Sequence, residues 1–297
     1  MTDDTTTIDS LLAPLLSPTG GFTMLALDQR ESLRRMFPLT GGHEVGDETL
    51  RGFKSAAIRE LTPFASGVLL DRPLAVTTDR PAGIDEASGL ILAADVLDQP
   101  AGQPVLSTSL DPFVTPEFID HVGAVAIKLL VIWRADGSED ARERLVRAFV
   151  TVAEEAGVAS LVEGIVRPAS GDEWASPQER HQAILDAARE LSSYGGTIYK
   201  AEVPGYLPGD VSGVREQALR LSDVVEGPWV VLSNGVALAD FADAVREACA
   251  GGASGFLAGR AIWSDVVAVD DPATALTGQP RERLQVLTRI VAEACGS

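Results

Sequence analysis

The sequence is poor in lysine, histidine and cysteine. Only three of its 24 basic residues are lysines (Lys54, Lys128 and Lys200), and the others are arginines. It has three histidines and two cysteines, without His-x-x-x-His or Cys-x-x-Cys spacing. Because zinc enzymes draw on such ligands, we expect no metal site and no cofactor. Two cysteines in helix-like patterns argue against a disulfide framework and favour a reducing compartment.

Positive charge and long hydrophobic runs are also scarce. The chain has 43 acidic against 24 basic residues, a net charge of −19, which argues against nucleic acid or an anionic membrane as partner. The longest apolar run, residues 124–133, is too short to cross a bilayer. The acidic N-terminus lacks the basic region of a signal peptide. We therefore expect a cytoplasmic protein whose anionic substrate is attracted by local arginines.

Eight short apolar runs alternate with helical patterns along the 297 residues. The runs are residues 21–28, 67–71, 89–93, 124–133, 158–163, 197–204, 229–233 and 254–258. This alternation predicts parallel βαβ units, and eight units are typical of a (β/α)8 barrel. We predict an α/β fold with a single (β/α)8 TIM barrel over residues 1–297, including an N-terminal lead and helix (1–20) and a C-terminal helix (281–295). A doubly wound sheet is the alternative, but G-x-G-x-x-G is missing after the first run.

Two of the lysines lie in apolar, strand-like runs, where a cation is costly to bury. Arginine does not release its proton in a protein, whereas lysine can. Lys128 and Lys200 therefore suggest an amine nucleophile that forms a Schiff base with a carbonyl. The alternative is that both form buried ion pairs, for example with Glu163 or Glu202. Lys54 lies in a polar helical pattern and is left out of this hypothesis.

Polar residues recur where the predicted strands end, which is where barrel enzymes place their catalytic groups. They are Asp28, Asp71, Lys128, Glu163, Lys200, Glu202, Ser233 and Arg260. Side-chain alternation places Lys200 and Glu202 on one strand face, which we interpret as the barrel interior. Residues 95–122 contain several prolines and give no clear pattern.

The last two predicted strands are each followed by a glycine and the start of a helix. Ser233-Asn234-Gly235 follows one and Gly259-Arg260 the other. Loops at these two positions commonly bind phosphate in this fold, through backbone N–H groups. Arg260 could add a bidentate contact to two phosphate oxygens. An ordinary turn would explain Ser-Asn-Gly alone, but the pair of loops favours a phosphate site.

Five segments resemble the class I aldolases, the family that includes sulfofructosephosphate and tagatose-1,6-bisphosphate aldolases. They are GFTMLALDQRE (21–31), IKLLVIWR (127–134), VE with VRP (162–168), IYKAEVP (198–204) and GASGFLAGRA (252–261). The resemblance runs from about residue 20 to 268, and the first and last segments are closer to the sulfosugar enzyme. The sequence departs from the family pattern in two places: Gly164 replaces an expected proline, and residues 71–73 differ.

The resemblance implies roles for individual residues. Lys200 corresponds to the Schiff-base lysine, Lys128 to a second active-site lysine, and Glu163 to the acid/base carboxylate. Asp28 is a further catalytic candidate. The candidates for binding substrate and its C1 phosphate are Gln29, Arg30, Asp71, Arg72, Ser233, Asn234, Gly235, Gly259 and Arg260. Arg30, Arg72 and Arg167 are candidates to bind an anionic group at the far end of the substrate.

The resemblance implies cleavage of 6-deoxy-6-sulfofructose 1-phosphate to dihydroxyacetone phosphate and sulfolactaldehyde, through an imine on Lys200 and without a metal. A tagatose or fructose 1,6-bisphosphate aldolase is one alternative. A non-catalytic sugar-phosphate-binding barrel and an isomerase are others, and Lys128 could replace Lys200 as the nucleophile. The expected partner is thus a phosphorylated ketose or sulfoketose, and the family resemblance implies a homo-oligomer.

Overall fold

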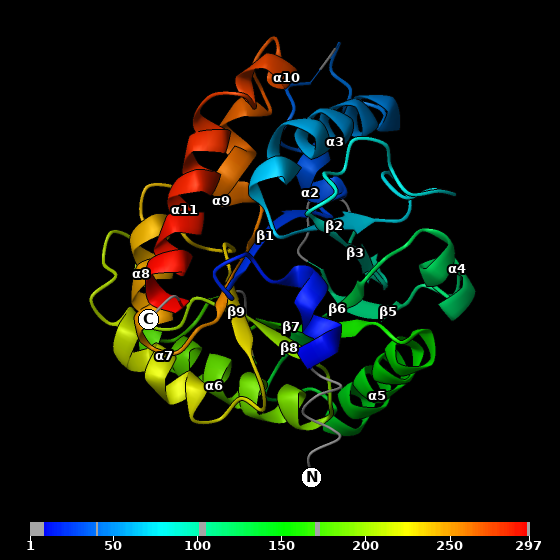
Figure 1. Ribbon diagram of the computed structural model, residues 1–297. Helices are drawn as coiled ribbons and strands as arrows, with labels where there is room; N and C mark the ends of the chain where they lie inside the picture. The colour runs from blue at the N-terminus through cyan, green and yellow to red at the C-terminus, as the bar shows by residue number, and fades with distance from the viewer. Residues whose placement is uncertain (1–8, 40, 101–104, 170–172, 296–297) are drawn as a thin grey trace.

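A closed barrel of eight parallel strands forms the centre of the protein in the computed structural model, which describes residues 9–39, 41–100, 105–169 and 173–295 (Figure 1). The strands are β1 (Phe22–Leu27), β2 (Gly67–Asp71), β3 (Gly89–Ala93), β6 (Ala126–Trp133), β7 (Ala159–Val166), β8 (Ile198–Glu202), β9 (Trp229–Leu232) and β10 (Gly255–Ala258). Their order around the barrel follows the chain. The predicted (β/α)8 barrel is confirmed, and each predicted apolar run overlaps one strand.

Helices surround the barrel (Figure 1). The α-helices are α2 (Glu31–Arg34), α3 (Asp47–Leu61), α4 (Pro116–His121), α5 (Glu139–Ala156), α6 (Pro177–Ser193), α7 (Val214–Ser222), α8 (Phe241–Ala250), α9 (Arg260–Trp263), α10 (Pro272–Ala275) and α11 (Gln279–Cys295). The 3-10 helices are η1 (Ala13–Leu15), η2 (Thr62–Phe64) and η3 (Ser264–Val266). The predicted C-terminal helix starts two residues earlier than expected, and residues 1–8 of the predicted N-terminal lead lie outside the described residues.

Local sequence signals explain where the long helices begin and end. The Ser138 hydroxyl accepts a hydrogen bond from the Ala141 N–H at 3.3 Å and so caps the start of α5. Gly157 ends α5 with φ of +67°, a left-handed conformation that suits glycine. Ser176 caps α6 by accepting from the Glu179 N–H at 3.1 Å. No helix in the described part of the chain has the length and apolar character needed to cross a membrane.

The stretch without a clear sequence pattern forms a hairpin and a short helix. Strands β4 (Asp95–Asp98) and β5 (Ser107–Leu110) pair antiparallel outside the barrel, and α4 follows. The hairpin comes directly after β3, so Asp95 lies at the carboxyl-terminal end of the barrel. Because its strands are short and partly exposed, they lack the apolar runs that identify barrel strands.

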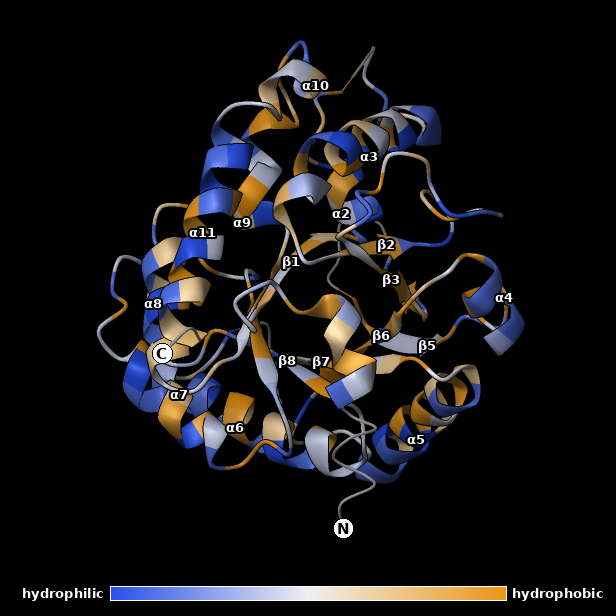
Figure 2. Cartoon of the chain, viewed as in Figure 1, coloured by the Kyte–Doolittle hydropathy of each residue, from blue (hydrophilic) through white to orange (hydrophobic). Residues whose placement is uncertain are grey.

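Apolar side chains pack inside the barrel and in the layer between strands and helices. Figure 2 shows hydrophobic and hydrophilic residues alternating along the surrounding helices. Inside the barrel, residues such as Met24, Leu69 and Ile198 pack with Leu15 of η1, which covers the end where the strands begin. The polar interior side chains are therefore found where the strands end. This is the end of the fold that barrel enzymes use for catalysis.

Candidate active site

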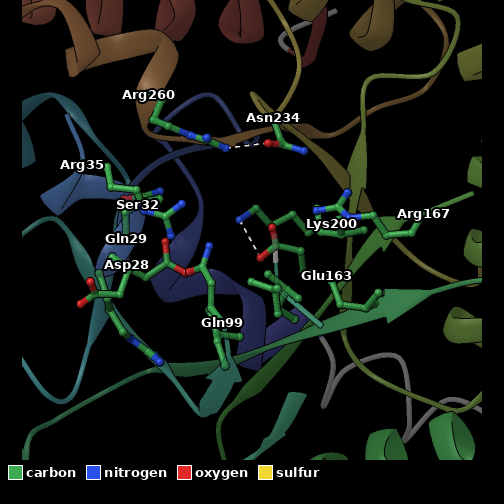
Figure 3. Close-up of a pocket in the computed structure, with 17 residues that line it drawn as sticks. Asp28, Gln29, Ser32, Arg35, Gln99, Glu163, Arg167, Lys200, Asn234 and Arg260 are labelled. Carbon is green, nitrogen blue, oxygen red and sulfur yellow. Dashed lines mark hydrogen bonds and ion pairs between the residues drawn. The ribbon is translucent and has the colours of Figure 1, made fainter. Parts of the chain in front are cut away.

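Two buried lysines and one glutamate meet inside the barrel, Lys128 from β6, Glu163 from β7 and Lys200 from β8. Figure 3 shows Lys200 and Glu163 of this group. Lys200 Nζ lies 3.0 Å from Oε2 of Glu163, and Lys128 Nζ lies 3.3 Å from the same oxygen. The barrel register places Lys200 directly beside Glu163 on the neighbouring strand. Lys128 and Lys200 are 1% and 3% exposed. A proton can therefore pass between Lys200 and Glu163 without crossing bulk water.

Three carboxylates surround the amine of Lys128. Besides Glu163, the amine contacts Asp28 Oδ2 at 2.7 Å and Asp95 Oδ2 at 2.8 Å. Burial acts to lower the pKa of Lys128, but the charges of these carboxylates outweigh it, so its pKa is raised. Lys128 therefore remains a cation. Asp95 was missed from the sequence, although it lies only two residues beyond the predicted strand at residues 89–93.

Asp28 provides a test of this electrostatic arrangement. Burial acts to raise its pKa, but Lys128 and then Lys200 outweigh burial and hold the pKa below its usual range. Because the pKa of Asp28 is lower in the folded than in the unfolded protein, its carboxylate stabilises the fold at pH values above the unfolded-state pKa of about 3.9. This stabilisation is lost as the pH falls toward the folded-state pKa. We expect Asp28→Asn to lower the free energy of unfolding by about 2 kcal/mol at pH 7.

The difference in free energy of unfolding between the parent and Asp28→Asn should shrink as pH falls below about 4, because the Asp28 carboxylate of the parent then becomes protonated and loses its stabilising effect. Denaturant titrations of parent and variant between pH 3 and pH 7 measure it. Asp186→Asn is the control, since Asp186 forms an exposed pair with Arg189 and should change stability by less than about 0.5 kcal/mol. A pH-independent effect of Asp28→Asn would contradict the arrangement.

A second layer of ion pairs holds Asp95 in place. Arg30 Nη2 donates to the backbone oxygen of Asp95 at 2.9 Å and to its Oδ1 at 3.1 Å. Arg30 Nε also lies 3.9 Å from Asp71. The guanidinium is thus engaged by two carboxylates, although Arg30 lines the cavity as predicted for a substrate contact.

Lys54 lies in a helix, as its sequence pattern indicated, but it is buried and takes part in an ion pair beneath the site. It is 1% exposed, and its amine donates to Asp71 and, at 2.6 Å, to the backbone oxygen of Leu27. It lies on the inner face of α3, at helical spacing from buried Leu50 and Ala57. Asp71 is fully buried and lies outside the cavity, so we assign it this pairing instead of a substrate contact.

Arg72, the other candidate near β2, also lies outside the cavity. Its Nε donates to Asp111 at 2.6 Å, and its guanidinium stacks over the ring of Phe113 at 4.8 Å. These contacts direct Arg72 toward the segment that follows the hairpin, away from the two lysines.

The predicted phosphate-site residues gather at the ends of β9 and β10. Arg260 Nη2 donates to Asn234 Oδ1 at 2.6 Å, and both residues line the cavity (Figure 3). Ser233 is buried beside them, and Gly235 has φ of +75°. A Cβ on Gly259 would lie 2.4 Å from the backbone oxygen of Ala26, so glycine permits the close approach of β1 and β10.

A cavity of about 430 Å³ opens above these groups. It is lined by Asp28, Gln29, Arg30, Glu163, Arg167, Lys200, Asn234 and Arg260 among the predicted residues, and also by Ser32 and Arg35, which the sequence did not single out. In the described part of the chain, Arg35, Arg167 and Arg260 form no ion pair with a carboxylate. The cavity therefore combines a buried amine with several arginines whose charge is uncompensated, a combination suited to an anionic substrate.

Gly164, where the sequence departs from the family pattern, faces away from this cavity. A Cβ at Gly164 would lie 2.1 Å from the hydroxyl of Tyr199 and 3.3 Å from Leu191. The glycine makes room for Tyr199 between the barrel and α6. Within the described ranges, no group of three or more His, Cys, Asp or Glu side chains has an arrangement suited to a metal ion.

An amine and a carboxylate in contact at the mouth of a (β/α)8 barrel are groups that carbon–carbon lyases of the aldolase type can use. Comparison with known proteins agrees with this class. Residues 22–265 match the DeoC/LacD family of aldolases, and the chain belongs to this family.

Individual relatives share the length of the chain. Tagatose 1,6-diphosphate aldolase 2 of Streptococcus pyogenes serotype M3 is 29% identical over 279 residues, covering 86% of this chain and 84% of the relative. The Enterococcus faecalis protein of the same name is 27% identical and covers 95% and 93%. A solved structure of Plasmodium falciparum fructose-bisphosphate aldolase matches with a TM-score of 0.71 at 16% identity, covering 100% of this chain and 96% of that one. The last similarity concerns the fold alone.

Proposed function

We propose that this aldolase is of class I and that Lys200 forms an imine with the C2 ketone of a ketose 1-phosphate. The observation that carries the proposal is the contact of Lys200 and Lys128 with one oxygen of Glu163. Lysine is the nucleophile that forms Schiff bases with carbonyl substrates. Lys128 is the less suitable nucleophile, because its three carboxylate contacts raise its pKa and hold its proton.

The charges around the amines support proton transfer inside the site. The cations are Lys128, Lys200 and Arg30, and the anions facing them are Asp28, Asp95 and Glu163. The group is therefore balanced when Lys200 is protonated. Transfer of the proton from Lys200 to Glu163 over 3.0 Å leaves that balance unchanged and yields a neutral amine.

The reaction then uses Glu163 as both acid and base. Lys200 Nζ adds to C2. The C2 oxygen receives one proton from protonated Glu163 and a second from the attacking nitrogen, relayed by Glu163, and leaves as water, so that the iminium forms and Glu163 ends as a carboxylate. Glu163 next takes the proton of the C4 hydroxyl. The C3–C4 bond breaks, its electrons pass to the iminium nitrogen, and an aldehyde leaves. Glu163 protonates C3 of the remaining enamine, and water releases dihydroxyacetone phosphate from Lys200.

The arginines lining the cavity suggest where the substrate anions bind. We place the C1 phosphate at Arg260 and Asn234, beside the amine of Lys200. Arg35 and Arg167 line the same cavity without a carboxylate partner in the described ranges, and they lie to either side of Lys200 (Figure 3). They are available for an anionic group at the other end of the ketose, whereas Arg30 is engaged by Asp95 and Asp71.

We propose 6-deoxy-6-sulfofructose 1-phosphate as the substrate, because the segments around Asp28 and Arg260 resemble the sulfosugar enzyme more than the tagatose enzyme. Tagatose 1,6-bisphosphate is the second candidate, favoured by the names of the relatives. The ratio of kcat/KM for the two compounds decides between them. Fructose 1-phosphate, which lacks the far-end anion, serves as the reference for how much that anion contributes.

Trapping with borohydride tests the imine. Incubation with dihydroxyacetone phosphate followed by reduction should add one three-carbon phosphate to the chain, and peptide mass spectrometry should locate it on Lys200. Without borohydride no adduct should persist, because the imine hydrolyses. An adduct on Lys128 would reverse the roles of the lysines, and no adduct on either would remove the imine mechanism.

A further inference from the structure

A second buried glutamate connects the strand ends around the candidate phosphate site. Glu202, at the end of β8, is 3% exposed. Its Oε2 accepts from the Val166 N–H of β7 at 2.9 Å, and its Oε1 accepts from Asn234 Nδ2, beyond β9, at 3.3 Å. Asn234 in turn accepts from Arg260 at 2.6 Å. Glu202 thus connects the ends of β7, β8 and β9 directly, and β10 through Asn234.

The hydrogen bonds from Asn234 to Glu202 and from Arg260 to Asn234 allow only one orientation of the Asn234 amide. A carboxylate only accepts hydrogen bonds, and a guanidinium only donates them. The amide must therefore turn its NH2 group to Glu202 and its oxygen to Arg260. A reversed amide would place donor against donor and acceptor against acceptor.

The arrangement also preserves the positive charge of Arg260. Glu202 Oε1 forms its ion pair with Arg180 Nη2 at 3.1 Å, so its charge is matched by a different arginine. Between Glu202 and Arg260 lies a neutral amide, which holds the guanidinium without neutralising it. A carboxylate in direct contact with Arg260 would compete with an incoming phosphate for the same N–H groups.

We infer that Glu202 is a positioning residue: through Asn234 it orients Arg260 and leaves its charge free for the substrate phosphate. The inference rests on the proposed role of Arg260 but not on imine formation at Lys200. The Glu202 carboxylate accepts hydrogen bonds from Val166, Arg180 and Asn234. The amine of Lys200 donates to Glu163 and not to Glu202.

Binding of inorganic phosphate tests this role independently of catalysis. Isothermal titration calorimetry on the parent, Glu202→Met and Asn234→Ala should show Kd values at least about tenfold higher for each variant than for the parent. The double variant should bind no more weakly than the weaker single variant, because both changes break the same chain of contacts. Arg260→Ala should abolish the effect of Glu202→Met.

Trapping with unphosphorylated dihydroxyacetone separates positioning from general damage to the fold. Its rate of reduction onto Lys200 should agree within about twofold between the parent and Glu202→Met, because this ketone makes no phosphate contact. Equal loss with both ligands would show a general structural role and overturn the inference. So would a parent-like phosphate Kd in Glu202→Met, independent effects of the two single changes, or a parent that binds no phosphate.

A milder variant covers the case in which Glu202→Met does not fold. Glu202→Asp keeps the charge but withdraws the carboxylate by one methylene, so it no longer reaches both Val166 and Asn234. Its phosphate Kd should also rise, by about threefold or more, while dihydroxyacetone trapping stays unchanged. A phosphate Kd equal to that of the parent in Glu202→Asp would overturn the inference.

If no ketone is trapped on Lys200 even in the parent, the imine mechanism fails, but the phosphate measurements still decide the role of Glu202.

Discussion

Replacement of Lys200 by arginine is expected to abolish carbon–carbon cleavage, with kcat/KM at least about 10⁴-fold lower than in the parent, equivalent to about 5 kcal/mol of transition-state stabilisation. Arginine keeps the positive charge beside Glu163 but does not release a proton to become a nucleophile. The change therefore removes the amine while preserving the ion pair that Lys200 makes at 3.0 Å. Cleavage rates of a ketose 1-phosphate, measured by coupled detection of dihydroxyacetone phosphate, give the result.

Lys200→Met is the companion variant, since it removes the charge as well as the amine. Both variants should lose the borohydride adduct completely. Inorganic phosphate should still bind to the arginine variant, because Arg260 and Asn234 make their contact independently of Lys200. Retained cleavage in Lys200→Arg, above about one per cent of the parent rate, would contradict an imine at this position.

The fold could be predicted from the sequence because a parallel barrel strand is buried on both faces. Such strands appear as short continuous apolar runs, and the helices between them have a different period. The runs at residues 67–71 and 89–93 coincide with β2 and β3. The hairpin of β4 and β5 was not predicted, because it lies outside the barrel and its exposed side chains follow no apolar pattern.

The central part of the site could also be predicted, because burial of a lysine in an apolar strand costs free energy unless its charge is paired. A lysine at such a position therefore indicates a paired or functional group. Lys128, Glu163 and Lys200 do meet at the mouth of the barrel. The sequence alone could not show which acidic residue would pair with which cation. Asp71 ends β2 much as Asp28 follows β1, yet Asp71 pairs with Lys54 across the β2–α3 interface. Such pairings depend on the distance between elements that are far apart in the chain.

Replacement of Lys128 by methionine is expected to lower the free energy of unfolding by about 3–5 kcal/mol at pH 7. Methionine has a similar volume but carries no charge, so Asp28, Asp95 and Glu163 would face one another without the cation that all three contact. Removal of one member of a buried ionic group costs more than the group itself contributes, because its partners remain buried with too little opposite charge. Here Glu163 keeps Lys200 and Asp95 keeps Arg30, but Asp28 loses the cation it contacts. Chemical denaturation of parent and variant gives the difference in free energy.

A double variant shows whether the loss arises from unpaired carboxylates. Lys128→Met with Asp95→Asn removes one anion together with the cation and should be more stable than Lys128→Met alone, by at least about 1 kcal/mol. Asp95→Asn by itself should destabilise the parent, since Asp95 accepts from Lys128, Leu130 and Arg30. If Asp95→Asn destabilises the parent but stabilises Lys128→Met, the loss in Lys128→Met comes from the excess of buried negative charge. If Asp95→Asn destabilises both backgrounds equally, the loss in Lys128→Met comes from packing, and the cluster does not hold Lys128 by charge.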